Sequence, residues 1–332
     1  MNQNSRRLLE LDSLRGIAAL LVCFFHFTTD YNHRFGHHPG LIFEVPLGFY
    51  GVHLFFIISG FVILMTLERT ERGFDFILSR FARLYPAYWV SVILNIALAA
   101  FYQFPITLKG MSVKELLLNF TMLQNAFGVG ILDSVYWTLQ VELYFYALLF
   151  CFHQLKWLGK IENLALVWLT VKVLASFLPV RILLLEYGQL FIAGMMFYKI
   201  YRDGFSMKRL AIIAVCFLMQ VWQLKEWGSS FLIASFMLSF FLLVSGRLKW
   251  IKNPFLVYLG TISYSFYLLH HNLGYAMIKK FYERNLSPNL NVVLTACVFL
   301  VLASLTTFFI EKPSQAAIKI AAKQGQLKKE PA

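Results

Sequence analysis

The segment LDSLRGIAALLVCFFHF, residues 11–27, is an apolar run that carries two ionisable side chains, Arg15 and His26. Since these residues are eleven positions apart, they face nearly the same side of an α-helix, roughly 16 Å apart along its axis. Asp12 lies one turn before Arg15. Ionisable groups inside a membrane helix are costly and usually face a polar cavity in which they act. The segment therefore predicts a first membrane helix with a functional polar stripe, or, as the structural alternative, a histidine that hydrogen-bonds a neighbouring helix.

The composition places the chain among polytopic membrane proteins. Of its 332 residues, 59% are hydrophobic and 14% are charged, which is too apolar for a soluble domain of this length. The formal net charge is +13, but the basic residues cluster at the ends of apolar runs, as the positive-inside rule predicts. The charge therefore indicates a membrane and no nucleic-acid partner. The four cysteines lie within apolar runs and indicate neither disulfides nor a metal site.

Ten apolar windows have about the length needed to span a bilayer. They fall near residues 14–31, 45–67, 82–104, 134–153, 162–179, 182–201, 209–226, 229–246, 255–279 and 290–311. Ten spans place both termini on one side, and the distribution of Lys and Arg makes that side the cytoplasm. We therefore predict an all-α, polytopic integral membrane protein with about ten transmembrane helices and cytoplasmic termini.

The windows leave no room for a folded domain outside the membrane. We expect one transmembrane domain over residues 1–313 and a Lys-rich, disordered cytoplasmic tail over residues 314–332. The longest outer connection, about residues 105–133, contains VKELLLNFTMLQN at 113–125. Its apolar residues recur at helical spacing, so this piece is expected to lie on the outer interface or to plug a cavity mouth.

Two further windows contain polar residues that are candidates for a functional site. His53 lies in GVHLFFIISGFVILM (51–65), where an imidazole either lines a site or rests at the membrane interface. Arg80 and Arg83 lie in FILSRFARLYPAYW (76–89) and, three residues apart, project from one face of a helix. Two guanidinium groups there can bind a phosphate, which favours a nucleotide-like donor from the cytoplasm. Ordinary positive-inside anchoring is the alternative.

Glu142 lies deep inside the apolar segment DSVYWTLQVELYFYALLF (133–150). A buried carboxylate needs a partner, and the imidazole of His26 is the obvious candidate. A carboxylate beside His26 would fix which ring nitrogen carries the proton, as a general base requires. A structural hydrogen bond to a backbone group or a tyrosine is the alternative.

The segment LGTISYSFYLLHHNLGY (259–275) is unusually polar for an apolar window. It contains Ser263, Tyr264, His270 and His271. Because successive residues on a helix point about 100° apart, at most one of the two histidines is expected to face a site.

Several common catalytic motifs are missing. The sequence contains no GxSxG, no Walker-type glycine loop, no CxxC and no HExxH, so a serine-hydrolase elbow, a P-loop ATPase and a zinc protease are unsupported. The loop histidines His33, His37 and His38 have no carboxylates or cysteines at ligand spacing, and we predict no metal site.

Six ordered blocks of the sequence resemble the membrane acyltransferase-3 family, whose members transfer acyl groups, mostly acetyl, to cell-surface glycans and related acceptors. The blocks are LDSLRGIAALLVCFFHF, GVHLFFIISGF, SRFARLYPAYW, WTLQVELYFYALLF, LGTISYSFYLLHH and FFIEKP. Together they span about residues 11–313, nearly the whole chain.

The resemblance implies a role for each matching residue. His26 would be the catalytic histidine, with Arg15 as its companion on the same helix. Arg80 and Arg83 would bind the phosphate-bearing end of acyl-coenzyme A at the cytoplasmic face. Glu142 would support the site as a buried carboxylate. Further candidates for lining the site are Asp12, His53, Ser263, Tyr264 and His270, although His53 stands where members often carry an acidic residue.

These features predict an O-acyltransferase of the plasma (inner) membrane. It would move an acyl group, most simply acetyl, from cytoplasmic acyl-coenzyme A to a hydroxyl of a cell-surface glycan or lipid-linked sugar, with His26 as general base. A route through an acyl-histidine is the alternative within this class. No metal and no nucleic acid are expected; a homo-oligomer, the acceptor and the acyl chain stay open. The rival is a proton-coupled transporter or flippase of a glycan or glycolipid, with His26, Glu142 and His270 as its proton relay.

Overall fold

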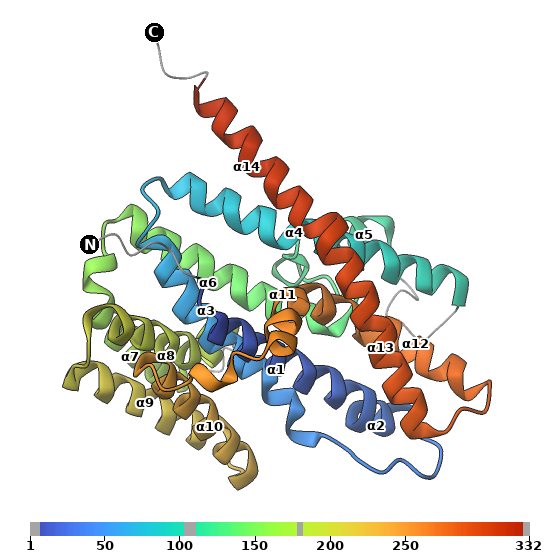
Figure 1. Ribbon diagram of the computed structural model, residues 1–332. Helices are drawn as coiled ribbons and strands as arrows, with labels where there is room; N and C mark the ends of the chain where they lie inside the picture. Colours follow the sequence, from blue (N-terminus) through green and yellow to red (C-terminus); the bar gives the residue numbers. More distant parts are fainter. Residues whose placement is uncertain (1–6, 103–110, 178–181, 328–332) are drawn as a thin grey trace. The chain divides into compact units, whose positions relative to one another are not determined.

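The computed structural model describes residues 7–102, 111–177 and 182–327, and every regular element within these ranges is a helix (Figure 1). The prediction of an all-α membrane protein is confirmed. Seven helices in this part of the chain are long and apolar enough to cross a membrane. They are Leu9–Phe35, Pro46–Leu67, Gly73–Tyr102, Ser134–Gln154, Met207–Leu224, Trp227–Val244 and Pro288–Ala321.

These seven helices correspond to seven of the ten predicted windows, and the other three windows differ. The window at 162–179 forms α7 (Ile161–Ala175), which is only 15 residues long. The window at 182–201 forms α8 (Leu183–Asp203), which is long enough but carries several polar residues. The window at 255–279 is divided into α11 (Pro254–Leu269) and α12 (His271–Tyr282) by a bend at His270. The exact number of spans and the side of the termini stay predictions.

The chain forms two compact units, each assembled from three separate stretches. Unit 1 comprises residues 1–22, 47–71 and 141–261, and unit 2 comprises residues 23–46, 72–140 and 262–332. The first division falls within α1 (Leu9–Phe25), so the opening helix contributes to both units.

Unit 1 is built on the close crossing of α3 (Gly51–Leu67) and α8. A Cβ atom on Gly60 would collide with the backbone carbonyl of Phe191, and one on Gly194 would collide with that of Ile57. Small residues permit such backbone approach between apolar helices. Unit 1 also contains α6 (Trp137–Gln154, from Val141 on), α7, α9 (Met207–Leu224) and α10 (Trp227–Val244).

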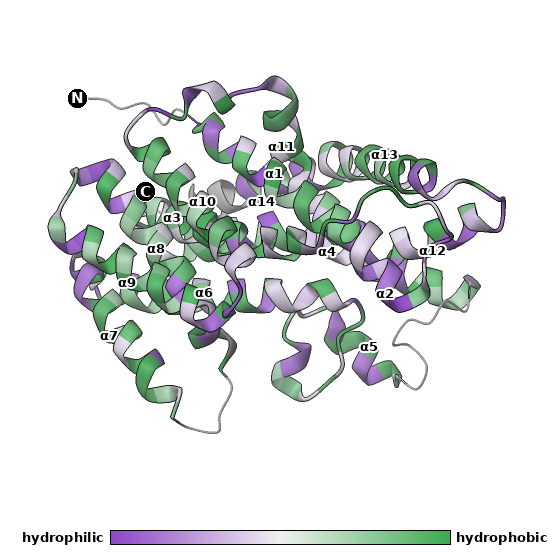
Figure 2. Cartoon of the chain, turned by 90° about the horizontal axis from the view of Figure 1, so that it is seen from below, coloured by the Kyte–Doolittle hydropathy of each residue, from purple (hydrophilic) through white to green (hydrophobic). Residues whose placement is uncertain are grey.

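Unit 2 combines long apolar helices with short polar ones. Its longest helix is α4 (Gly73–Tyr102), and α12 contacts α13 (Pro288–Thr306). Figure 2 shows apolar residues along most of α13 and hydrophilic residues on α2 (Tyr31–Phe35) and α5 (Val113–Asn119). The unit also holds two π-helical turns, η1 (His26–Asp30) and η7 (Thr307–Glu311).

The predicted amphipathic piece at 113–125 is α-helical over α5, and its last two residues begin the 3-10 turn η3 (Gln124–Phe127). The structure does not describe residues 103–110 of this connection. A capping box starts α5, because the Ser112 hydroxyl accepts from the Glu115 N–H while the Glu115 carboxylate accepts from the Ser112 N–H. The turn after α5 is bound to α4 through backbone carbonyls of residues 119–121, which accept from Tyr85, Tyr88 and Trp89.

The segment after residue 313, for which we expect a disordered cytoplasmic tail, is helical as far as the structure describes it. The chain continues from α13 through η7 into α14 (Lys312–Leu327), which Figure 1 shows in red. Both η7 and α14 contact α4. Packing against a neighbouring helix supplies the stability that composition alone did not predict. Residues 328–332 lie outside the described part of the chain.

Candidate active site

Three histidines meet in unit 2. His26 opens the π-helical turn η1, and His270 and His271 lie at the bend between α11 and α12. The ring centroids of His270 and His271 are 5.2 Å and 4.5 Å from that of His26, and all three side chains are buried. The sequence predicts that at most one of the adjacent histidines faces a site; in the structure both rings lie beside that of His26, because the helix bends at His270.

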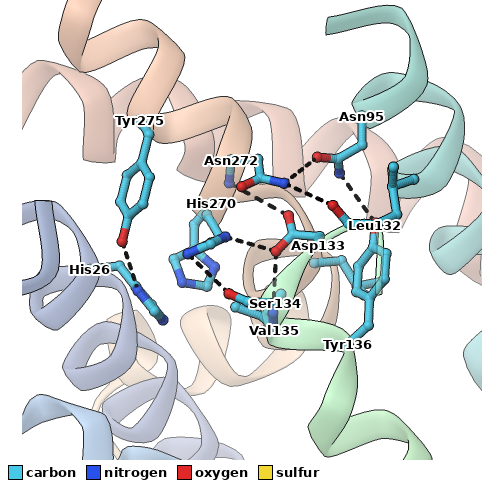
Figure 3. Close-up of polar contacts among 12 residues, drawn as sticks. His26, Asn95, Leu132, Asp133, Ser134, Val135, Tyr136, His270, Asn272 and Tyr275 are labelled. Atoms are coloured by element: carbon cyan, nitrogen blue, oxygen red, sulfur yellow. Dashed lines mark hydrogen bonds and ion pairs between the residues drawn. The ribbon is translucent and has the colours of Figure 1, made fainter. Parts of the chain in front are cut away.

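His26 has a carboxylate and a phenol at the same ring nitrogen. Its Nδ1 lies 3.3 Å from Asp30 Oδ2. The same nitrogen lies 3.0 Å from the Tyr275 hydroxyl (Figure 3). The Tyr275 hydroxyl donates to Asp30, and Arg34 Nε donates to the same carboxylate at 2.8 Å. A proton on Nδ1 that is shared with Asp30 leaves the Nε2 lone pair of His26 available as a base.

Asp30 is thus the carboxylate that lies beside His26, a position for which the sequence suggested Glu142. Glu142 belongs to unit 1, where its Oε1 accepts from the hydroxyls of Ser59 and Tyr146, each at 2.5 Å. Asp30 had a signal in the sequence that we did not use: it follows His26 by four residues, a spacing at which helical side chains meet.

A second imidazole–carboxylate pair lies beside the first. His271 Nδ1 is 2.7 Å from Asp133 Oδ1, and His271 Nε2 is 3.3 Å from Ser134 Oγ. Asp133 also accepts from the backbone N–H of Val135 at 3.2 Å and so starts the 3-10 turn η4 (Ser134–Tyr136). Sequence reasoning singled out neither Asp133 nor Ser134.

Amide side chains fix the loop that carries Asp133. Asn272 Nδ2 donates to Asn95 Oδ1 at 3.0 Å and to the Leu132 carbonyl at 3.3 Å. Asn95 Nδ2 in turn donates to the Tyr136 hydroxyl at 3.2 Å (Figure 3). Since Asn95 is on α4 and Asn272 is on α12, two helices hold this loop in place.

The predicted arginine pair lies on α4, also in unit 2. Arg83 pairs with Glu311, a buried carboxylate that also accepts from Ser265 Oγ at 3.0 Å. The Arg83 guanidinium lies 5.4 Å from the ring centroid of Tyr264, whose hydroxyl donates to the Leu84 carbonyl at 2.7 Å. The sequence did not anticipate that Glu311 would fix one of the two arginines.

Arg80 has different surroundings from Arg83. Its guanidinium lies 5.8 Å from the ring centroid of Phe76, and its Nη2 donates to Ser79 Oγ at 3.1 Å. Both arginines are half-buried. Ser263, another predicted lining residue, is buried in unit 2.

Besides Glu142, three predicted site residues belong to unit 1. Asp12 Oδ1 accepts from Arg15 at 3.4 Å, and its Oδ2 accepts from Arg7 at 2.5 Å. His53 is buried among aromatic rings, with its centroid 5.1 Å from that of Tyr50. The structure thus brings Arg15 to Asp12 and gives His53 apolar surroundings.

His26, Asp30 and His271 could also hold a metal ion, because their ligand atoms lie within 4.8 Å of one another. Imidazole nitrogen and carboxylate oxygen are the ligands that Zn²⁺ accepts. Each of the three side chains already has a protein partner, such as Asp133 for His271 and Arg34 for Asp30. The hydrogen-bonded arrangement accounts for their proximity, and the absence of a metal cofactor stays a prediction.

The fold and the site together define a polytopic helical membrane protein with a buried histidine–carboxylate centre. The family model of the acyltransferase domain, Acyl_transf_3, matches residues 8–309 of this chain. The chain therefore belongs to this acyltransferase family, as the six sequence blocks predicted.

One curated relative gives the same assignment. A protein of Acidianus two-tailed virus that is named as an acetyltransferase is 30% identical over 142 residues, which are 43% of this chain and 40% of the viral protein. The chain thus spans about two fifths of the length of the curated relative it matches. No solved structure matches this chain.

Proposed function

We propose that this acyltransferase is an O-acetyltransferase of the plasma (inner) membrane. It takes acetyl from cytoplasmic acetyl-coenzyme A and transfers it to a hydroxyl of a cell-surface glycan or a lipid-linked sugar. The observation that carries the proposal is the pairing of His26 with Asp30 in a chain that matches the acyltransferase family over residues 8–309. The viral relative named as an acetyltransferase supports the choice of acetyl.

His26 would be the general base of the transfer. Its Nε2 takes the proton of the acceptor hydroxyl as the oxygen attacks the thioester carbon, and the C–S bond breaks as the C–O bond forms. The same imidazole then gives its proton to the coenzyme A thiolate. Asp30 stabilises the imidazolium and fixes the ring, while Tyr275 positions Asp30 by donating to its carboxylate.

Arg80 and Arg83 would bind the phosphates of the donor. A guanidinium has five N–H donors, so the ion pair with Glu311 orients Arg83 without using all of them. Glu311 thereby acts as a positioning residue for the donor site. Arg15, which Asp12 orients in unit 1, is proposed to steady the donor.

A pocket of about 440 Å³ in unit 2 suits a sugar acceptor. Its lining is Tyr31, Phe35, Gly36, His38, Lys279, Tyr282 and Glu283. Aromatic rings cover the apolar faces of a ligand, and the few charged groups can bind its hydroxyls. The pocket is close to the proposed base, since the ring centroids of Tyr31 and Tyr275 are 5.6 Å apart and Tyr275 contacts His26.

Turnover of radiolabelled acetyl-coenzyme A tests the proposal. We expect the purified wild type to release coenzyme A and to label an added glycan, and we expect His26→Ala to do neither while keeping its melting temperature. His153→Ala is the matched control, because His153 is a half-buried histidine of unit 1 that contacts a backbone carbonyl. Turnover of no acyl-coenzyme A species by the wild type would overturn the proposal in favour of a proton-coupled transporter.

A further inference from the structure

Ser134, His271 and Asp133 have the arrangement of an activated nucleophile. The serine is exposed, whereas the histidine and the aspartate behind it are 3% and 1% exposed. Ser134 Oγ lies 3.3 Å from His271 Nε2, and His271 Nδ1 lies 2.7 Å from Asp133 Oδ1. The serine hydroxyl therefore contacts one ring nitrogen of the imidazole, and a carboxylate lies within ion-pair distance of the other. In this position the carboxylate can stabilise the imidazolium that forms when the serine loses its proton.

We propose that Ser134 is a catalytic nucleophile that accepts the acyl group before the acceptor does. The inference rests on the proposed function, because it requires acyl-coenzyme A as the donor. Such a constellation is recognised by its geometry and by the roles of its members, so the missing GxSxG motif is no argument against it.

Bonds and protons are conserved over the two proposed acyl-transfer steps. In the first, Ser134 Oγ attacks the thioester carbon, its proton passes to His271 Nε2, the C–S bond breaks, and the thiolate of coenzyme A takes the proton. In the second, the acceptor hydroxyl attacks the acyl-serine and loses its proton to His26. The Oγ–carbon bond breaks, and the proton on His26 passes to His271 and from there to the serine oxygen, so both imidazoles return to the neutral state. Coenzyme A and the acylated acceptor are the products.

The surroundings of the cluster fit these roles. Asp133 is held by the N–H of Val135, so its carboxylate is a fixed positioning group for His271. The ring centroids of His271 and His26 are 4.5 Å apart. An acyl group on Ser134 therefore stays near a second imidazole that can deprotonate the acceptor.

The test is to incubate the holoprotein in detergent with radiolabelled acetyl-coenzyme A, without acceptor, and to locate the label after acid denaturation and digestion. We expect one acetyl group on the wild type, on the peptide that contains Ser134, and none on Ser134→Ala. Ser112→Ala is the matched control, because Ser112 is another exposed serine at the start of a helix and its hydroxyl contacts Glu115. Its labelling should equal that of the wild type.

Two further variants separate a chemical role from a structural one. Ser134→Cys should give a thioester that neutral hydroxylamine cleaves, whereas the oxygen ester of the wild type resists this treatment. Asp133→Asn should lower kcat and leave the KM for acetyl-coenzyme A unchanged, because the carboxylate acts through His271 and does not touch the donor.

The outcomes distinguish this inference from the proposed function. If Ser134→Ala transfers acetyl at the wild-type rate, or if the label is found on His26 instead, the acyl-serine is wrong and the acyltransferase stands. If the wild type turns over no acyl-coenzyme A, both proposals fail. Label on Ser134 that is chased to an added acceptor supports both.

Discussion

At the scale of single residues, the imidazole of His26 is paired with a carboxylate four residues further along the chain. Asp30 contacts Nδ1 and accepts from both Tyr275 and Arg34. Two donors besides the imidazole hold the Asp30 carboxylate in place. His26 thus has a fixed orientation before any substrate binds, which is the condition for an efficient general base.

Replacing Asp30 by Asn should therefore lower kcat by about 100-fold or more, since the imidazolium loses its stabilising charge and the ring loses its preferred tautomer. Initial rates of coenzyme A release measure the effect. Glu44→Gln is the control, because Glu44 is a carboxylate of the same unit that accepts from the side-chain amide of Asn32. An Asp30→Asn variant with wild-type kcat would show that His26 needs no carboxylate.

His37 gives a pH dependence that lies outside the membrane helices. Its Nε2–H donates to the Phe27 carbonyl at 2.9 Å, and its Nδ1 accepts from the Tyr282 hydroxyl. Burial lowers the pKa of His37 below its usual 6.5, so the folded protein holds the ring neutral. The unfolded chain binds the proton more readily, and stability must fall as the pH drops below 6.5.

Melting temperatures between about pH 8 and about pH 5 test this expectation. The wild type should lose stability over the lower part of that range, and His37→Gln, which keeps a donor and an acceptor but cannot titrate there, should lose less. His33→Gln is the control, a histidine of the neighbouring helix α2. Equal slopes for wild type and His37→Gln would assign the pH dependence to other groups.

At the scale of the elements, the two π-helical turns share a feature. Both end on a carboxylate that organises a polar cluster: η1 ends on Asp30 at His26, and η7 ends on Glu311 at Arg83. Single π turns inside helices are frequent at functional sites. A sequence analysis that assumes a constant α-helical period does not reveal π turns. For this reason the sequence did not predict either contact.

The crossing of α3 and α8 depends on the absence of side chains at two positions. Gly194→Ala should lower the stability of the protein by about 1–3 kcal/mol, because the new Cβ would meet the backbone of Ile57, which cannot rotate away. The melting temperature in detergent measures the loss. Gly159→Ala is the control, since nothing lies within 4 Å of a Cβ at Gly159. Equal melting temperatures for the two variants would contradict the close crossing.

At the scale of the whole molecule, each unit is assembled from stretches that are far apart in the sequence. His26, Asp133 and His271 come from three different stretches of unit 2. Donor binding should therefore be visible as a change in the stability of the entire protein, since a ligand that binds only the native state stabilises it.

Coenzyme A at about 100 times its dissociation constant should stabilise the wild type by about 2.7 kcal/mol. Arg80→Ala should reduce that shift, because the variant lacks one of the two proposed phosphate ligands. Acetyl-pantetheine, which lacks the nucleotide phosphates, should be turned over equally by wild type and Arg80→Ala. Arg72→Ala, which removes a neighbouring basic residue just before α4, is the control. If coenzyme A stabilises Arg80→Ala as much as it stabilises the wild type, Arg80 does not belong to the donor site.

The sequence by itself determined that the chain is an all-helical membrane protein of the acyltransferase family, because apolar length and ordered motifs are local properties. It also identified His26, Arg80, Arg83 and His270 as residues of interest. Seven of its ten windows became helices long and apolar enough to cross a membrane.

Only the tertiary structure decided which polar groups meet. The partners of His26 and Arg83 turned out to be Asp30 and Glu311, and Ser134 acquired an imidazole from a residue more than a hundred positions away. Such contacts depend on π turns, on a bend at His270 and on the packing of distant helices. A hydrogen bond extends over about 3 Å, so partners separated along the chain are fixed only when folding brings their atoms within that distance.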